Sequence, residues 1–251
     1  MTAPPRVLAI AGSDSSGGAG IQADIKTITM LGGYAMTAIT AVTAQNTRGV
    51  QAVEALAPEF VSAQIDSCLS DIGADAVKIG MLGSADIAAL VADRLESLAV
   101  PVVFDPVMVA TSGSALADTA TVAAFERLMR LATLTTPNVA ELEALGGSAA
   151  MAGRGVTYLA KGGDAGGPKV EDRLVRPGSD DRVWRAPRIV TRHTHGTGCT
   201  LSSAIATLLG MGHSLEDAIG GARRFVRAAL EAAPGFGSGH GPLGHAGVRL
   251  D

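Results

Sequence analysis

Short apolar runs recur along the chain and alternate with longer segments in which apolar residues return every three or four positions. Runs of four to eight apolar residues are typical of buried strands, and the longer periodic segments are typical of amphipathic helices. The pattern predicts strands over residues 6–11, 36–42, 76–79, 102–104, 132–134 and 156–160. It predicts helices over residues 19–31, 58–72, 84–97, 119–130, 139–144, 198–210 and 215–232.

Strands that alternate with helices build a mostly parallel sheet with helices on both faces. The sequence therefore predicts one α/β domain over residues 1–251, with its functional residues in loops at the carboxyl ends of the strands. Residues 168–186 are charged and poor in apolar runs, so we expect an exposed hairpin or flap there.

Composition narrows the class of protein. A net charge of −4, with no basic stripe, argues against a nucleic-acid surface, and no apolar stretch is long enough to span a bilayer. The chain has two cysteines and no secretory signal at its start, so we expect a cytoplasmic protein without disulfides. Cys68 falls at helical apolar spacing, which predicts a core position.

Residues 195–200, His-Gly-Thr-Gly-Cys-Thr, stand at the start of an apolar helix. The first amides of a helix lack intrahelical partners and carry the positive end of the helix dipole, so they stabilise phosphate and lower the pKa of a thiol. The segment predicts an anion site with a reactive cysteine, Cys199. The alternative is a glycine-rich helix start that holds a buried, structural cysteine.

A second glycine-rich loop, residues 12–24, follows the first predicted strand. It is not a P-loop, because no lysine follows its second glycine. Residues 18–23 fit the dinucleotide pattern G-x-G-x-x-A, but the next predicted strand offers no acid for a ribose hydroxyl. The loop is therefore expected to bring backbone amides and Asp14 or Asp24 against a small polar ligand.

Single polar residues follow the other predicted strands. The amide of Gln45 suits a planar heterocycle, and Met81 suits an apolar lid, although a solvated loop and a core position are the respective alternatives. Asn138 and Glu141 fit either a hydrated Mg²⁺ site or a helix capping box. Lys161 either reaches a phosphate or is solvated. Residues 237–245 carry two histidines without metal-site spacing, and we expect a loop near the site.

Taken together, these motifs resemble the hydroxymethylpyrimidine/phosphomethylpyrimidine kinases of thiamine biosynthesis, within the ribokinase-like superfamily. The resemblance runs from residue 7 to about residue 245 and rests on residues 11–14, 17–24, 44–47, 78–81, 105–108, 136–138, 161–163 and 195–200. It implies a three-layer α/β/α ribokinase-like fold, ATP and Mg²⁺ as cofactors, and a homodimer. It also implies successive phosphorylation of 4-amino-5-hydroxymethyl-2-methylpyrimidine to its mono- and diphosphate.

The resemblance assigns roles to residues of this chain. The pyrimidine side would be formed by Gln45, Gly12, Ala19 and Met81, with Asp24 in support and Val107 in the lining. The anion hole would be formed by Gly196, Thr197 and Gly198, with Cys199 facing the hydroxymethyl group and accepting its proton. The nucleotide and its Mg²⁺ would be served by Lys161, Asn138, Thr194, Glu141 (through water) and Asp105.

Two departures and two rival functions accompany the resemblance. Residues 145–158 are shorter than the family pattern, so a surface helix there is expected to be missing or cut to a turn. Thr111 stands where many relatives carry a lysine. The rivals are a pyridoxal kinase, whose substrate also bears a hydroxymethyl group on a six-membered ring, and a non-catalytic pyrimidine-binding regulatory protein.

Overall fold

The computed structural model describes residues 3–109, 113 and 116–249. Its strands are β1 (Arg6–Asp14), β2 (Tyr34–Asn46), β3 (Gly49–Ala55), β4 (Ala76–Ile79), β5 (Val102–Phe104), β6 (Leu134–Thr135), β7 (Tyr158–Ala160), β8 (Lys169–Val175) and β9 (Arg182–Pro187). Its helices are α1 (Gly20–Met30), α2 (Pro58–Asp71), α3 (Ala85–Leu95), α4 (Thr119–Leu131), α5 (Val139–Ala144), α6 (Gly147–Arg154), α7 (Thr197–Gly210) and α8 (Leu215–Glu231), with a short 3₁₀ turn, η1 (His245–Gly247). None of the helices in the described part of the chain is both long and apolar enough to cross a membrane.

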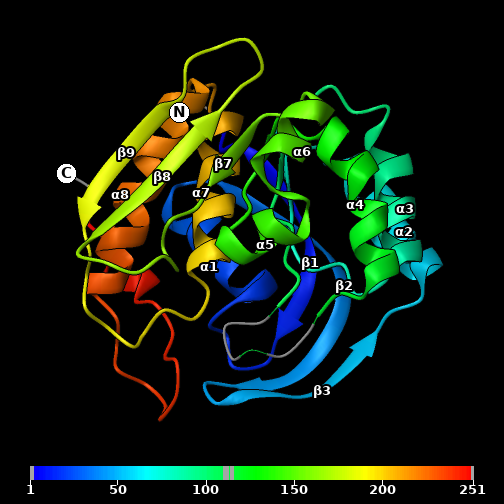
Figure 1. Ribbon diagram of the computed structural model, residues 1–251. Coiled ribbons are helices and arrows are strands. Elements are labelled where there is room, and N and C mark those ends of the chain that lie inside the picture. The colour runs from blue at the N-terminus through cyan, green and yellow to red at the C-terminus, as the bar shows by residue number, and fades with distance from the viewer. Residues whose placement is uncertain (1–2, 110–112, 114–115, 250–251) are drawn as a thin grey trace.

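The strands form one nine-stranded sheet in the order β3-β2-β1-β4-β5-β6-β7-β8-β9. Six neighbouring strands in the middle of the sheet are parallel, namely β2, β1, β4, β5, β6 and β7. At the two edges, β3 is antiparallel to β2, β8 is antiparallel to β7, and β9 is antiparallel to β8. Helices cover both faces of the sheet (Figure 1). The prediction of a three-layer α/β/α fold is confirmed.

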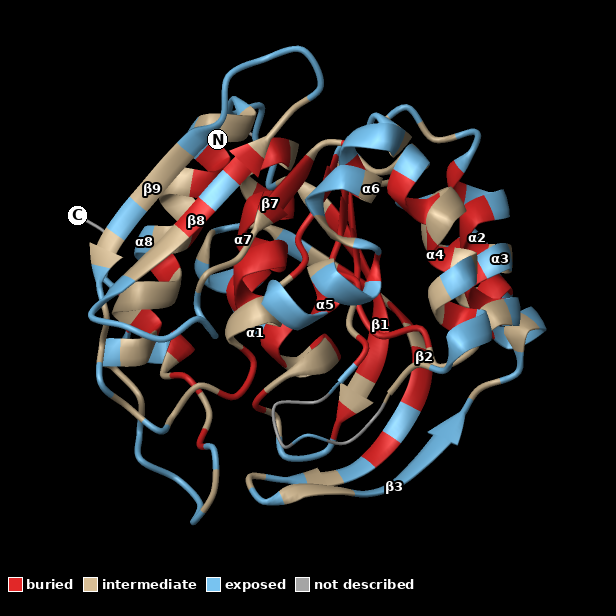
Figure 2. Ribbon diagram, in the orientation of Figure 1, coloured by how far each residue is buried: buried red, intermediate tan, exposed pale blue. Residues whose placement is uncertain are grey.

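Alternation along β1 shows how the layers are held. Leu8 and Ile10 pack on one face with α2, α3 and α4, while Val7 and Ala9 pack on the other with α1, α7 and α8. Both sets are fully buried, and Figure 2 shows the buried residues concentrated along the central strands while β3 is exposed. Because β1 has helices on both faces, it reads as a continuous apolar run.

Two expectations about elements need correction. Strand β2 continues to Asn46, so Gln45 belongs to the strand and does not follow it, and the antiparallel β3 was not predicted at all. The predicted strand over 132–134 is β6 (Leu134–Thr135). For the charged stretch 168–186, where we expected an exposed hairpin or a flap, the structure shows the hairpin, and its strand β8 pairs with β7 and extends the sheet.

The helix expected to be missing between residues 145 and 158 is present as α6, with eight residues. Gly146 and Gly155, at its two ends, have φ values of 94° and 66°. A left-handed glycine ends a helix, so Gly146 separates α6 from α5 and Gly155 ends α6. The side chain of Met151, in the middle of α6, is buried. The prediction was therefore wrong about the loss of the helix. Thr111 lies outside the described residues. Cys68, in α2, is partly buried and packs against the hydrophobic core on the face of the sheet that α2 covers, which agrees with the predicted core role.

Candidate active site

The glycine-rich loop between β1 and α1 is organised by the Asp14 carboxylate. Its oxygens accept hydrogen bonds from the amides of Ser16 (2.9 Å), Gly18 (3.1 Å) and Ala19 (2.8 Å) and lie 2.8 Å from Nε2 of His195. Burial raises the pKa of Asp14, but the hydrogen bonds from His195, Ser16 and Ala19 outweigh it and lower the pKa to about 2. Asp14 therefore holds the loop in place and is not available to a ligand.

The start of α7 lies directly against this loop. Gly196 has a φ of 90°, and a Cβ on it would lie 1.9 Å from the carbonyl oxygen of Gly18. A Cβ on Gly18 would in turn lie 2.3 Å from Cδ2 of His195. The two glycine-rich motifs, far apart in the sequence, thus require glycine because Gly196 lies against the backbone of Gly18, and Gly18 lies against the imidazole of His195. The same Cβ on Gly196 would lie 3.2 Å from Cα of Ala19, so Ala19 and Gly196 are neighbours.

The first amides of α7, where the sequence predicts an anion site, differ in their hydrogen bonding. The amide of Thr197 donates to the carbonyl oxygen of Thr194 (3.3 Å), so it is partly used. Within the described residues, nothing accepts a hydrogen bond from the amides of Gly198 and Cys199. These two amides, at the positive end of a fourteen-residue helix, are available to an anion.

A cation and two carboxylates lie beside this helix start. Lys161 Nζ is 2.6 Å from Asp105 Oδ1 and 3.7 Å from Glu141 Oε2. A Cβ on Gly198 would lie 3.3 Å from both Asp105 Oδ2 and Lys161 Nζ. Burial opposes the charge of Lys161, but Asp105 and Glu141 raise its pKa, so the ammonium is retained. Lys161 is therefore paired and nearly buried, which excludes the solvated alternative.

Asn138 and Glu141 form a capping box at the start of α5. The Asn138 amide donates to Glu141 Oε2 (2.7 Å), and the Glu141 amide donates to Asn138 Oδ1 (2.9 Å). The capping interpretation is thus correct. Glu141 also has a second contact, because its carboxylate faces Lys161. Burial raises the pKa of Glu141 in spite of the attraction of Lys161. A further cation near Glu141 would be favoured.

Beneath the site lies an ion pair that the sequence analysis missed. Lys78 Nζ is 2.8 Å from Asp24 Oδ2, and Ser203 donates to Asp24 Oδ1 (2.7 Å). Both charged side chains are fully buried, so Asp24 cannot touch a substrate. The signal in the sequence was Lys78 itself, because a lysine inside the apolar run of β4 needs a buried counter-charge. Gly80 leaves room for it, since a Cβ there would lie 2.8 Å from Lys78 Nζ.

The expectation that the helix start lowers the pKa of Cys199 is wrong. Burial raises the pKa of its thiol to about 11, and the nearby carboxylates of Asp24 and Asp105 add to this effect. The charge of Lys78 and the amide of Gly20 oppose the shift without reversing it. Desolvation of the thiolate is therefore the largest influence on this thiol.

The residues that the sequence analysis assigned to the heterocycle make the following contacts. Gln45 Nε2 lies 3.5 Å from His195 Nε2, and Gln45 Oε1 accepts a hydrogen bond from Thr43 (3.1 Å). A Cβ on Gly12 would lie 2.1 Å from Cε of Met81, so these two residues are in contact. Val107 is half-buried after β5, and its amide donates to the carbonyl oxygen of Asp105. His195 therefore contacts both Gln45 and the carboxylate of Asp14.

Several known proteins are similar to this chain over most of its length. The model of the family described as phosphomethylpyrimidine kinase matches residues 14–244. The hydroxymethylpyrimidine/phosphomethylpyrimidine kinase of Streptomyces coelicolor is 45% identical over 256 residues, which cover 96% of this chain and 94% of that protein. Two thiamine biosynthesis proteins are longer. This chain spans 52% of the bifunctional ThiED of Geobacter sulfurreducens (46% identity) and 36% of the multifunctional ThiED of Corynebacterium efficiens (42% identity).

Two solved structures show the same fold. The ADP complex of Bacillus subtilis pyridoxal kinase superposes with a TM-score of 0.87 at 33% identity and covers 99% of this chain and 100% of that one. The phosphomethylpyrimidine kinase of Clostridium difficile superposes with a TM-score of 0.76 at 36% identity and covers 90% of this chain and 99% of that one.

Proposed function

The chain belongs to the phosphomethylpyrimidine kinase family, and on that premise we propose that it phosphorylates hydroxymethylpyrimidine with ATP, first to the monophosphate and then to the diphosphate, in thiamine biosynthesis. The observation that carries the proposal is the start of α7. There the free amides of Gly198 and Cys199 adjoin Lys161 on one side and the glycine-rich loop on the other. A donor phosphate and an acceptor can meet at such a point.

Phosphoryl transfer asks mainly for alignment and charge neutralisation. Negative charge is spread over the oxygens of the transferred group in a loose transition state. Backbone amides that are fixed by the helix stabilise this charge without reorganising, and Lys161 adds a full positive charge. We assign the anion hole to Gly196, Thr197 and Gly198 with the amide of Cys199, and the nucleotide side to Lys161, Asn138 and Thr194.

The donor set beside Lys161 fits Mg²⁺. Two buried carboxylates, Asp105 and Glu141, face a single ammonium, which leaves net negative charge in the site. Magnesium binds through one or two carboxylates and keeps water and phosphate oxygens as its other ligands. The described residues contain no group of three or more acidic, histidine or cysteine side chains that would enclose a metal, and Mg²⁺ does not need one. Bound Mg²⁺ would neutralise the phosphate charge, with Asp105 and Glu141 holding it, the latter through water.

The acceptor side follows from the amide of Gln45. A carboxamide carries both a donor and an acceptor, so it can pair with a ring nitrogen and with the amino group next to it. Ala19, Gly12 and Met81 would flank the ring, and Val107 would complete the lining. Asp24 supports this side from below through its buried pair with Lys78.

Pyridoxal is the alternative acceptor, and the superposition on the Bacillus subtilis pyridoxal kinase favours testing it. The purified chain is incubated with ATP and Mg²⁺ and with hydroxymethylpyrimidine, its monophosphate or pyridoxal in parallel, and the products are resolved by mass. We expect the pyrimidine diphosphate from both pyrimidines. Turnover of pyridoxal alone would overturn the proposal in favour of a vitamin B6 kinase. Absence of turnover with every acceptor would favour the non-catalytic binding protein.

The proposal extends to the protein as a whole. A single kinase domain is supported by the match of the family model to residues 14–244. A homodimer in the cytoplasm is our expectation from the family resemblance. Light scattering of the purified chain and fractionation of cells test these two points.

A further inference from the structure

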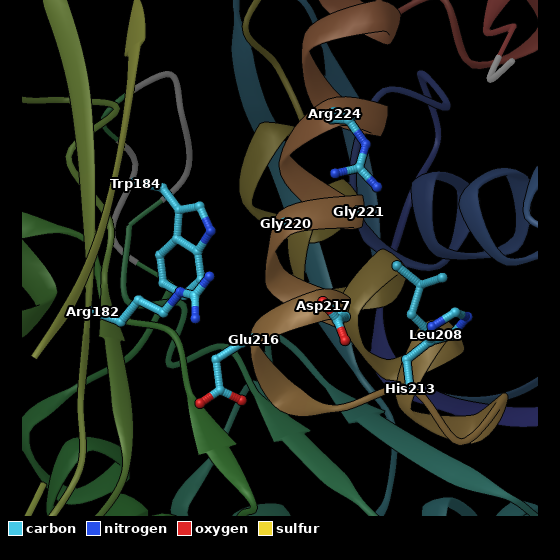
Figure 3. Close-up of a pocket in the computed structure, with 9 residues that line it drawn as sticks. All are labelled: Arg182, Trp184, Leu208, His213, Glu216, Asp217, Gly220, Gly221 and Arg224. Atoms are coloured by element: carbon cyan, nitrogen blue, oxygen red, sulfur yellow. The ribbon is translucent and has the colours of Figure 1, made fainter.

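A cavity of about 390 Å³ lies between β9 and α8, apart from the residues assigned to phosphoryl transfer. Trp184 and Arg182 reach into it from β9, Arg224 from α8 and Leu208 from α7 (Figure 3). Leu208 follows Cys199 by nine residues in the same helix, which is about 14 Å along the helix axis. The cavity is therefore at the other end of α7 from the anion hole.

Hydrogen-bond donors converge on a glycine in the middle of α8. A Cβ on Gly220 would lie 3.8 Å from Nε1 of Trp184 and 3.7 Å from a guanidinium nitrogen of Arg224. Its neighbour Gly221 is explained by packing, because a Cβ there would lie 2.8 Å from Cδ1 of Leu208. No comparably close contact requires Gly220 to be glycine, although glycine is unfavourable inside a helix. The space above Gly220 is bare backbone with an indole N–H and a guanidinium beside it.

The charge at this cavity is positive once its ion pairs are counted. Neither Arg182 nor Arg224 forms an ion pair with any described residue, and Arg182 instead lies 5.4 Å from the centre of the Trp184 ring. Of the two acids of the lining, Glu216 is neutralised by Arg176 (2.6 Å), whereas Asp217 keeps its charge and accepts a hydrogen bond from Ser214 (2.7 Å) at the start of α8. Two guanidinium groups therefore stand against one unpaired carboxylate among the described residues, and the lining keeps a net positive charge.

We infer that this cavity binds a small planar anion, an aromatic or heteroaromatic ring that carries a phosphate or a carboxylate. The anionic group lies over Gly220, where the Arg224 guanidinium and the Trp184 N–H donate to it. Guanidinium groups match the oxygens of both phosphate and carboxylate. The ring lies against Leu208 and the indole, which supply the apolar surface that ligand cavities offer. The inference does not depend on the proposed kinase function.

Trp184 is the only tryptophan of the chain, so its fluorescence reports on this cavity directly. The full chain is titrated with phenyl phosphate and with benzoate, and with inorganic phosphate and benzyl alcohol as the two halves of the ligand. We expect saturable changes with phenyl phosphate or benzoate, and the tighter of the two identifies the anionic group. Each half alone should bind about tenfold or more weakly, because the ring and the charge are held by different side chains.

Two variants place the binding at Gly220. Arg224→Gln removes a charged donor and should weaken binding by about 10- to 100-fold. Gly220→Met fills the bare space with a good helix former and should abolish binding while the melting temperature is kept or raised. Arg130→Gln, on the exposed face of α4, is the matched control and should bind like the unmodified chain.

The inference is overturned if neither ring compound gives a saturable change at millimolar concentration. It is equally overturned if Arg224→Gln and Gly220→Met bind as tightly as the Arg130→Gln control. Circular dichroism of both variants is the check that the fold is intact, so that a loss of binding is not attributed to unfolding.

Discussion

At the scale of single residues, the candidate site depends on buried charges that are paired with one another. Asp14 holds the first loop, Asp24 pairs with Lys78, and Asp105 pairs with Lys161. Removing one partner of a buried pair leaves an uncompensated charge, which is more harmful than removing both. These residues therefore fix the positions of the amides and of the acceptor pocket as much as they provide charge.

The raised pKa of Cys199 leads to a prediction about the first phosphorylation. If its thiolate accepts the hydroxyl proton, the active fraction grows about tenfold for each pH unit below the pKa of about 11. We expect the kcat/KM of hydroxymethylpyrimidine phosphorylation to rise from pH 7 to pH 9. Phosphorylation of the monophosphate should lack this rise, because a phosphate with a second pKa of about 6 is already ionised.

The matched variant is Cys199→Ala. It should flatten the pH profile of the alcohol and slow its phosphorylation far more than that of the monophosphate. An identical slope in the variant, or equal losses in both steps, would show that Cys199 positions groups without taking the proton.

His245 should make the protein sensitive to mild acid. Burial lowers the pKa of its imidazole from 6.5 to about 4, the charge of Lys26 adds to this, and a ring nitrogen lies 2.9 Å from Oγ1 of Thr200. In the unfolded chain the His245 imidazole takes up a proton near pH 6.5, whereas in the folded chain it stays neutral down to about pH 4. The free energy of unfolding therefore falls between these values, by up to about 3 kcal/mol from this residue.

Urea unfolding of the unmodified chain and of His245→Gln at pH 7.5 and pH 4.5 isolates this contribution. The glutamine side chain does not titrate. The variant should therefore lose less stability on acidification than the unmodified chain, by about 3 kcal/mol. Equal losses in both proteins would mean that His245 is protonated in the folded state.

At the scale of elements, α7 connects the parts of the site. Its start meets the β1–α1 loop and Lys161, and Ser203, one turn further on, reaches the Asp24–Lys78 pair. Most of its residues are buried, so the helix is held on all sides. A helix fixed in this way presents its first amides in one orientation, which is what electrostatic stabilisation requires.

Asp172 of β8 ties the loop after Lys161 to α8. Its carboxylate accepts hydrogen bonds from the Gly162 amide (2.9 Å) and from Arg223 (2.6 Å), and both side chains are largely buried. We expect Asp172→Asn to lower the free energy of unfolding by about 3 kcal/mol, because Arg223 loses its counter-charge. It should also raise the KM for ATP, since Gly162 adjoins Lys161.

Urea unfolding and ATP kinetics measure the two effects. The control is Arg173→Gln in the same strand, whose exposed pair with Asp181 is worth less than about 1 kcal/mol. If the two variants lost the same stability, the buried pair would not have the importance assigned to it.

The strands and helices with a clear apolar period were predictable from the sequence. The failures have physical reasons. β3 is exposed along its length and pairs only at the edge of the sheet, so it carries no apolar run. α6 is short and lies between glycines, which resemble a loop in sequence. The hairpin of β8 and β9 was predictable, but its place in the main sheet was not, because its charged residues include Asp172, whose buried partner Arg223 is 51 residues away.

At the scale of the whole molecule, the candidate site is assembled at the carboxyl ends of β1, β2, β4, β5, β6 and β7 and at the start of α7. The motifs were visible in the sequence, and so was the class of reaction. What could not be predicted is which polar residues pair with one another. The pairs Asp14–His195 and Asp24–Lys78 join residues that are distant in sequence, and neither partner indicates the other. The pKa of Cys199 was mispredicted for the same reason, because its burial comes from the assembled fold.

The central claim is that phosphoryl transfer takes place where the start of α7 meets Lys161 and Asp105. The most direct measurement is the rate of hydroxymethylpyrimidine phosphorylation in Gly198→Ala, whose new Cβ would lie 3.3 Å from both side chains. The account predicts a loss on the order of 10²-fold, as for misplaced reacting groups, with the melting temperature preserved. Gly153→Ala in α6, which has open space around it, should retain the full rate. An undiminished rate in Gly198→Ala would contradict the account.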